Sequence, residues 1–178
     1  MKILTLLRHA KSGWDDPVAR DFDRPLNQRG RRAAVTVGRA FKAEAMHFDA
    51  VIASPAVRVV DTLRELAHGY GRALEPRHDP GLYLASPATL LERIQRTDDS
   101  VDRLLVVGHN PGLEQLAMLL AGSDRSGCLG ELEDKYPTAS VAVIELDVDR
   151  WADVRKGAGA LVRFIRPRDL DPELGPDD

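Results

Sequence analysis

The stretch KILTLLRHAKS, residues 2–12, decides the fold. Its first part is apolar apart from Lys2 and Thr5 and barely alternates, which is typical of a strand buried on both faces of a parallel sheet. The run then ends in Arg8 and His9, two side chains that are costly to bury without partners. A buried strand that delivers an arginine and a histidine at its carboxyl end indicates a binding site at that edge of the sheet.

Two more runs have the same character, DAVIA at 49–53 and RLLVVG at 103–108. Between them, apolar residues recur every three or four positions, which predicts amphipathic helices. Three helix starts are predicted where an N-cap residue precedes a proline, namely at Ser54-Pro55, Ser86-Pro87 and Asn110-Pro111. Strands that alternate with helices predict an α/β domain of three layers, α/β/α, around a mostly parallel sheet.

The later part of the chain has a different pattern. ASVAVIELDV at 139–148 and ALVRFIR at 160–166 predict two late strands, a hairpin-like pair at the sheet edge with a turn or short helix near Trp151. The stretch 122–137 is the longest predicted loop, and we expect it to border a site.

The length of 178 residues is typical of one domain that can bury a sizeable core. We assign residues 1–166 to a single domain. Residues 167–178 are rich in proline and acidic residues, which predicts a flexible, frayed tail. A hydrophobic content of 43% with 30% charged residues indicates a soluble globular protein, and a monomer is the default expectation.

Composition also narrows the class of partner and compartment. A net charge of −3 argues against a general nucleic-acid binder, and no apolar window is long enough for a membrane span. The strand at residue 2 leaves no room for a signal peptide after Met1. A single cysteine, Cys128, excludes an internal disulfide and favours a reducing compartment. The expectation is a cytoplasmic protein.

Three predicted strand ends supply the candidate site. Arg8 and His9 follow the first strand, and His109 follows the 103–108 strand. Arg58 lies in the first turn of the helix after the second strand. Because the carboxyl ends of parallel strands meet at one edge of the sheet, we expect these four side chains to converge. The starts of the helices add backbone N–H groups and positive dipole ends there.

Such a cluster fits a phosphoryl group. Arg8 and Arg58 match phosphate oxygens in a bidentate manner. Burial beside two guanidinium groups should lower the pKa of His9, which keeps the imidazole neutral and able to attack phosphorus. His109 can donate to an oxygen that gains charge in the transition state. The arginines supply the charge that a metal would bring, so neither a metal nor a cofactor is expected.

Four motifs resemble one known family. LLRHAKS resembles the Arg-His-Gly signature of the histidine phosphatase (phosphoglycerate-mutase-like) superfamily, with Ala10 in place of glycine. RPLNQRG at 24–30 is similar to its Leu-Thr-x-x-Gly element. SPAVRVVDT at 54–62 resembles its Ser-Pro-x-x-Arg-x-x-x-Thr element, and VVGHNPG at 106–112 its second histidine motif. RHAKS, the short length and KYPTASVAVIEL at 135–146 are most similar to the SixA-type phosphohistidine phosphatases.

The resemblance implies that His9 is the nucleophile and that the two arginines and His109 bind phosphate. It also implies a mixed sheet that includes an antiparallel strand, and a substrate that is either a phosphohistidine-bearing protein or a small phosphate ester. Ser12 and Asn110, which lie in the motifs beside the histidines, are candidate substrate-binding residues.

The sequence departs from the broader family at three places. Asp15 stands where many members carry an asparagine near the phosphate, and a carboxylate there disfavours a dianion unless it points away. The usual acid after the strand before GLYLASP is missing, which leaves Asp79 as the nearest candidate general acid. The segment between Thr62 and Val106 is too short for a cap domain.

Several functions stay open at this point. A phosphohistidine phosphatase is favoured, because an uncapped site admits a protein surface and phosphohistidine has a labile bond that makes less demand on an acid. A phosphatase of small phosphate monoesters would need a working acid near Asp79. A non-catalytic module that binds phosphoryl groups would keep the two arginines but could dispense with His9. A metal hydrolase built on His9, His109 and Asp15 is disfavoured because the arginines would repel a cation.

Overall fold

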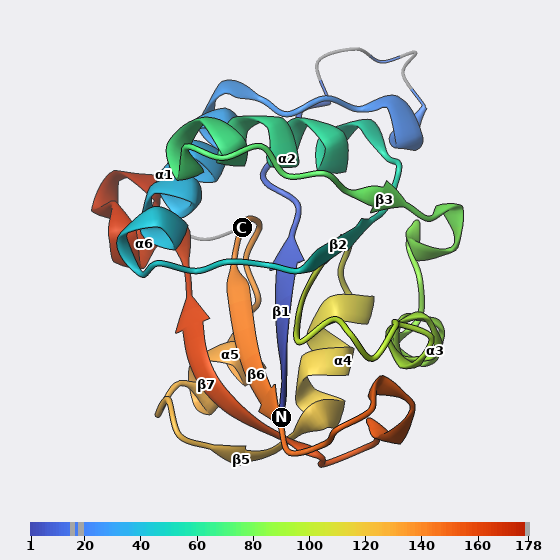
Figure 1. The fold of residues 1–178 in the computed structure, drawn as a ribbon. Coiled ribbons are helices and arrows are strands. Elements are labelled where there is room, and N and C mark those ends of the chain that lie inside the picture. Colours follow the sequence, from blue (N-terminus) through green and yellow to red (C-terminus); the bar gives the residue numbers. More distant parts are fainter. Residues whose placement is uncertain (15–16, 18–19, 177–178) are drawn as a thin grey trace.

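The computed structural model describes residues 1–14, 17 and 20–176, so Asp15 lies outside the described part of the chain. Within that part, seven strands form one sheet in the order β3-β2-β4-β1-β6-β7-β5 (Figure 1). The strands are β1 (Lys2–Arg8), β2 (Ala50–Ala53), β3 (Arg77–His78), β4 (Arg103–Gly108), β5 (Ala121–Asp124), β6 (Val141–Leu146) and β7 (Gly159–Ile165).

The α-helices are α1 (Gln28–Ala43), α2 (Val57–Tyr70), α3 (Pro87–Gln95), α4 (Gly112–Leu120), α5 (Leu129–Asp134) and α6 (Pro167–Leu170). Short 3₁₀ helices also occur, η1 (Asp21–Asp23), η2 (Pro80–Leu82), η3 (Trp151–Asp153) and η4 (Pro172–Leu174). In the described residues no helix is both long enough and apolar enough to cross a membrane.

The sheet is mixed and mostly parallel, as predicted. β1, β4, β2 and β3 run parallel to one another, and β5 runs parallel to β7. β6 is antiparallel to both β1 and β7. The first three apolar runs therefore form the parallel strands that the sequence predicts, with β4 between β1 and β2.

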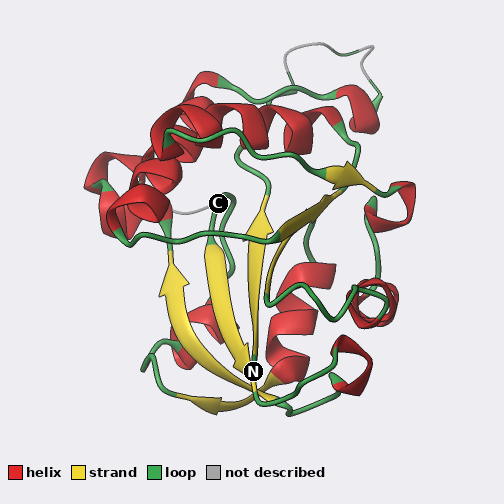
Figure 2. Ribbon diagram, in the orientation of Figure 1, coloured by secondary structure: helices red, strands yellow, loops and turns green. Residues whose placement is uncertain are grey.

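Helices cover both faces of this sheet, which gives the three-layer architecture (Figures 1 and 2). Along β1, Leu4 and Leu6 belong to the core under α3, α4 and α5, whereas Leu7 belongs to the core under α1 and α2. β4 alternates in the same way, with Leu104 and Val106 facing one core and its neighbours the other. Because both faces are buried, the strands read as continuous apolar runs.

Part of the later chain differs from the prediction. The two late strands exist as β6 and β7 and are antiparallel, and η3 lies at Trp151 as expected. However, β6 is inside the sheet between β1 and β7, and β5 forms that edge. The predicted 122–137 loop holds most of β5 and all of α5. Most of β5 is exposed and polar, so it has no apolar alternation from which to predict a strand.

One of the three predicted helix starts is correct. Ser86 is the N-cap of α3, with Pro87 in its first turn. α2 begins two residues after Pro55 and α4 begins one residue after Pro111, so neither Ser54 nor Asn110 is the N-cap. Ser54 bonds to His109, and the Asn110 amide donates to the Tyr136 carbonyl.

The prediction of a frayed tail from residue 167 is wrong for residues 167–176. This segment forms α6 and η4 and packs beside α1. Arg29 donates to the Gly175 carbonyl at 2.8 Å, and Arg32 pairs with Asp171 and Glu173 at 2.6 Å each. The acidic composition indicated disorder because its basic partners lie on α1, distant in sequence. Residues 177–178 lie outside the described part.

Candidate active site

The parallel strands bring three segments of the chain to one edge of the sheet. His9 follows β1, Arg58 lies in the first turn of α2 after β2, and His109 follows β4. All three side chains are at least nine-tenths buried. Arg58 Nε donates to His9 Nε2 at 3.3 Å, and Arg58 Nη2 lies 3.3 Å from His109 Nδ1. The predicted cluster is therefore assembled around one guanidinium group.

The His9 ring is held with one nitrogen free to react. His9 Nδ1 lies 2.7 Å from the Ala10 carbonyl oxygen, so Nδ1 carries the proton and Nε2 keeps its lone pair. The Ala10 N–H donates to Thr62 Oγ1 at 2.9 Å, and that hydroxyl donates to the Arg58 carbonyl at 2.6 Å. Burial, reinforced by His109 and the two nearby arginines, lowers the pKa of His9 to about 3. The imidazole is neutral at physiological pH.

His109 is held in a similar state. Its ring lies 5.2 Å from the ring of His9, measured between centroids, and its Nε2 lies 2.7 Å from Ser54 Oγ. Burial and then Arg58 lower the pKa of His109 to about 4, against the opposing effect of Asp21. Because Arg58 donates to Nδ1, Nε2 carries the proton that bonds to Ser54.

Arg8 is anchored by the segment before β6. Arg8 Nη1 donates to the Tyr136 carbonyl at 2.9 Å, and the Tyr136 hydroxyl donates to the Leu6 carbonyl at 2.6 Å. Arg8 also contributes to the low pKa values of both histidines, so its charge reaches the centre of the site. Tyr136 lies near the end of the 122–137 stretch predicted as a long loop, and that stretch does border the site.

The two further substrate-binding candidates have structural contacts. The Asn110 amide donates to the Tyr136 carbonyl at 3.1 Å and to Glu114 Oε2 at 3.2 Å, which ties the second histidine motif to the wall behind Arg8. Ser12 forms an isolated β-bridge with Leu26. These contacts hold the loops that carry the histidines, and contact of either side chain with phosphate stays a prediction.

The structure does not bring Asp79 into the cluster as a proton donor. Asp79 is the N-cap of η2, where it accepts from the Gly81 N–H at 2.8 Å, and it pairs with Arg93 at 2.7 Å. Burial alone would raise the pKa of this carboxyl, but Gly81 and Arg93 outweigh it and the net pKa is lowered. Asp79 is ionised and committed to a helix cap, so we withdraw it as the general acid.

Two residues that sequence reasoning missed complete the site. Arg58 Nη2 lies 3.1 Å from Asp21 Oδ2, and Arg58 Nη1 donates to the Asp21 carbonyl at 2.7 Å. The Tyr83 hydroxyl donates to the Asp21 carboxylate, and the Tyr83 ring packs edge-on against His109 at 5.4 Å. Asp21 lies on the short 3₁₀ helix η1 before α1, where no apolar period indicates which side chains point inward.

These contacts set the charge of Asp21. Burial would raise the pKa of its carboxyl, but the Tyr83 hydroxyl and Arg58, with Arg24, lower it overall. Burial, followed by the bond to Asp21, raises the pKa of Tyr83. The site thus contains an ionised carboxylate on the Arg58 fork. Among the described residues, no group of three or more histidine, cysteine or acidic side chains is arranged to hold a metal ion.

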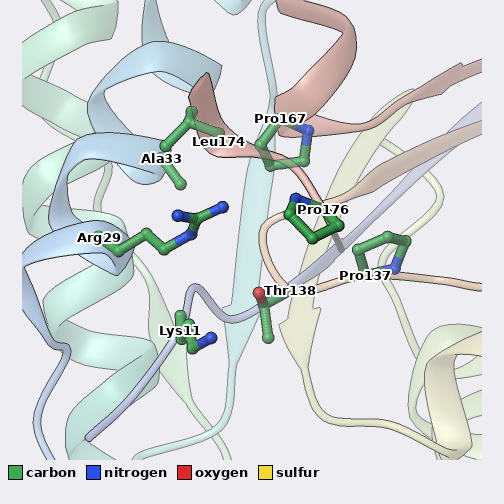
Figure 3. A pocket seen from close by; sticks show the side chains of 8 residues that line it. All are labelled: Lys11, Arg29, Ala33, Pro137, Thr138, Pro167, Leu174 and Pro176. Atoms are coloured by element: carbon green, nitrogen blue, oxygen red, sulfur yellow. The ribbon is translucent and has the colours of Figure 1, made fainter. Parts of the chain in front are cut away.

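A small pocket lies nearby, where the N-terminal end of α1, the loop before β6 and the C-terminal segment meet (Figure 3). Lys11 and Arg29 contribute basic side chains to it, and Pro176 closes part of its wall. None of the four clustered side chains lines this pocket. Close packing supports this corner, because a Cβ atom at Gly30 of α1 would lie 2.1 Å from the Lys11 carbonyl oxygen.

The buried histidines make stability depend on pH. Below about pH 6.5 an unfolded chain binds a proton at each histidine, whereas His9 and His109 in the folded state resist protonation until about pH 3 and 4. The unfolded state therefore binds more protons in that window, and the free energy of unfolding falls as the pH drops through it. At pH 5 we expect a loss of about 2 kcal/mol for each of the two histidines relative to pH 7.5.

Urea unfolding at pH 7.5 and 5.0 measures this loss. A His9→Gln/His109→Gln variant should lose less stability on acidification than the wild type by the sum of those two contributions. An identical pH dependence of the two proteins would contradict the low pKa values.

Comparisons with known proteins agree with this geometry. Residues 4–83 match the family model of the histidine phosphatase superfamily (branch 1). The chain is 42% identical to the uncharacterized protein Rv1276c of Mycobacterium tuberculosis over 164 residues, which cover 91% of this chain and 100% of that protein. A structure from Agrobacterium tumefaciens, assigned as a phosphohistidine phosphatase SixA, is 26% identical with a TM-score of 0.78. The alignment covers 93% of this chain and 98% of that one.

The chain belongs to the histidine phosphatase superfamily. A second SixA-type structure, from Nakamurella multipartita and with the same assignment, is 27% identical with a TM-score of 0.77, over 93% of this chain and 96% of that one. Within the superfamily the chain is of the SixA type, and it is a phosphatase. The family model covers His9 and Arg58, whereas His109 lies beyond the matched residues and enters the site through the fold.

Proposed function

We propose that this histidine phosphatase hydrolyses phosphohistidine in a protein through a covalent intermediate on His9. One observation carries the proposal: His9 Nε2 is unprotonated and faces Arg58 in a buried site that also contains Arg8. A neutral imidazole is a nucleophile, and the guanidinium beside it attracts the phosphoryl group that the imidazole attacks. No metal or cofactor takes part in the proposed reaction.

The reaction has two displacements at phosphorus. In the first, the lone pair of His9 Nε2 forms a bond to phosphorus while the bond to the substrate's leaving nitrogen breaks. In the second, a water oxygen bonds to phosphorus, the P–Nε2 bond breaks and inorganic phosphate leaves. Arg8 and Arg58 bind the equatorial oxygens in both steps, and His109 adds a hydrogen bond once the phosphoryl charge raises its pKa.

A protein substrate is supported by the rim of the site. The segment from Thr62 to Val106 is used by α2, β3, η2, α3 and the start of β4, and adds no cap domain. Trp14 is 68% exposed and lies under the Arg24 guanidinium, which is 3.6 Å from its ring centroid. Arg24 pairs with Asp21, so this exposed aromatic ring stands beside the phosphate-binding cluster. Tryptophan is enriched among the residues that contribute most to protein–protein binding, so an exposed tryptophan at the rim supports contact with another protein.

The comparisons also support this substrate class, because the SixA-type structures that match this fold bear the name phosphohistidine phosphatase. The deciding experiment measures kcat/KM for a phosphohistidine-bearing carrier protein and for p-nitrophenyl phosphate, both in the presence of a chelator. We expect a strong preference for the carrier protein and no turnover by His9→Ala. Faster turnover of the ester would indicate that the substrates are small phosphate monoesters. Loss of activity in chelator would support a metal hydrolase.

A further inference from the structure

We propose that Asp21 is the proton-transfer residue of this phosphatase, donating a proton to the leaving group and then accepting one from water. The inference rests on the proposed phosphatase reaction at His9 and assigns the acid–base role that Asp79 does not fill. Asp21 lies on η1, outside every motif that carries the family resemblance, and it is held against Arg58 by two contacts.

The Arg58 guanidinium places Asp21 relative to the nucleophile. Its Nε atom faces His9 Nε2, whereas Nη2 faces the Asp21 carboxylate as well as His109 Nδ1, and Nη1 donates to the Asp21 backbone carbonyl. A phosphoryl group bound along the edge from Nε to Nη2 has His9 at one end and Asp21 toward the other. Displacement at phosphorus requires the leaving group to depart opposite the nucleophile. The carboxylate therefore lies toward the side from which the leaving group departs.

The charges around Asp21 explain how it can gain and lose a proton. It faces Arg58 from α2, Arg24 at the end of its own helix, and the hydroxyl of Tyr83 after η2. These groups keep the carboxyl ionised in the free protein. A bound phosphoryl group shares Arg58 and adds negative charge beside Asp21, which raises the pKa of the carboxyl. Substrate binding thus favours protonated Asp21, as a general acid requires.

The proton then balances in both steps. As His9 Nε2 bonds to phosphorus, the electron pair of the breaking bond goes to the leaving atom, which takes the proton from Asp21. The resulting carboxylate accepts a proton from the water whose oxygen bonds to phosphorus in the second step. The pair from the P–Nε2 bond returns to His9, phosphate departs, and Asp21 is protonated until it exchanges with solvent.

Neighbouring acids have other partners. Asp23, on the same short helix, pairs with Arg20 at 2.8 Å and is partly exposed. Glu114 bonds to Asn110, and Asp79 is paired with Arg93. Asp23 therefore provides a matched control, because it shares the segment and the charge of Asp21 without the contact to Arg58.

The test compares two phosphate esters that differ in leaving group, p-nitrophenyl phosphate and phenyl phosphate. p-Nitrophenolate leaves without help, whereas phenolate needs a proton. We expect Asp21→Asn to lower kcat/KM for phenyl phosphate by about 100-fold or more, and kcat/KM for p-nitrophenyl phosphate by less than about tenfold. The asparagine oxygen still accepts from Arg58 and Tyr83. Asp23→Asn should leave both values unchanged.

The outcomes separate this role from the others. An equal loss with both esters would mean that Asp21 only positions Arg58, which overturns the acid–base role. An equal effect of Asp23→Asn would mean that the loss of activity comes from a change in the segment, which also overturns the acid–base role of Asp21. If wild type hydrolyses neither ester in a His9-dependent manner, nor the carrier protein, the proposed function itself fails.

The pH profile gives a second readout that does not depend on Asp21→Asn folding. At saturating phenyl phosphate, kcat of the wild type should fall as the pH rises and Asp21 loses its proton in the complex with substrate. Tyr83→Phe removes a hydroxyl that stabilises the carboxylate, so this alkaline limb should move to higher pH. A limb that stays in place in Tyr83→Phe would overturn the assignment.

Discussion

His9→Ala should lower phosphatase activity by at least about 10⁴-fold, because it removes the imidazole nitrogen that attacks phosphorus. The ring is buried, and burial lowers the pKa of His9 to about 3, so Nε2 of the wild type keeps its lone pair at physiological pH. Wild type incubated with substrate and quenched in alkali should gain the mass of one phosphoryl group, in an acid-labile linkage on the peptide that contains His9. The variant should gain none.

A matched histidine variant separates catalysis from general damage. His47 follows the C-terminal end of α1, away from the strand ends that carry the site, so His47→Ala should keep wild-type activity. The alanine variant of His9 should still bind tungstate, since Arg8, Arg58 and His109 remain. Substantial activity in His9→Ala, or a phosphorylated peptide elsewhere in the chain, would contradict the assignment of the nucleophile.

Arg58→Lys should lower kcat/KM by about 10² to 10³-fold although it preserves the charge. The Arg58 fork contacts His9, His109 and Asp21 at the same time through three different nitrogens. A lysine ammonium is a single point on a flexible stem and cannot keep these three directions. The loss should appear in both kcat and KM, because the fork binds phosphate in the ground state and in the transition state.

Arg64 provides the control for this exchange. It lies on the same helix, is largely exposed and pairs with Asp61, so Arg64→Lys should leave kcat/KM within about twofold of wild type. Steady-state kinetics on the same substrate, with circular dichroism to confirm folding, measure both variants. Near-normal activity of Arg58→Lys would mean that positive charge alone suffices at this position.

The central sheet and the four clustered side chains could be predicted from sequence because one physical rule governs both. Strands buried on both faces appear as apolar runs, and parallel strands end at one edge, so the residues after β1 and β4 must meet. The position of Arg58 at the same edge follows from its place in the first turn of the helix after β2. This prediction does not require the energies of individual side-chain contacts.

The remaining features depend on contacts between distant segments. Asp21 reaches the site because its segment folds over Arg58, and the local sequence does not indicate this contact. β5 pairs at an exposed edge through its backbone, which leaves no apolar signature. The C-terminal segment was predicted to fray from its composition, although Arg29 and Arg32 of α1 hold it. Asp79 fits the acid role by its position in the sequence, and its bonds with the Gly81 N–H and Arg93 remove it from that role.

The order of strands in the sheet has a consequence for folding kinetics. β4 lies between β1 and β2, so the groups of the active site meet only after a segment from the second half of the chain inserts between two from the first half. Contacts of such large sequence separation form slowly. Trp151, by contrast, is fully buried in the core on the α4 side, and its indole N–H bonds to the Val101 carbonyl. Because the other tryptophan, Trp14, stays exposed in the folded protein, the change in tryptophan fluorescence during refolding reports the burial of that core, while the return of catalysis marks insertion of the central strand.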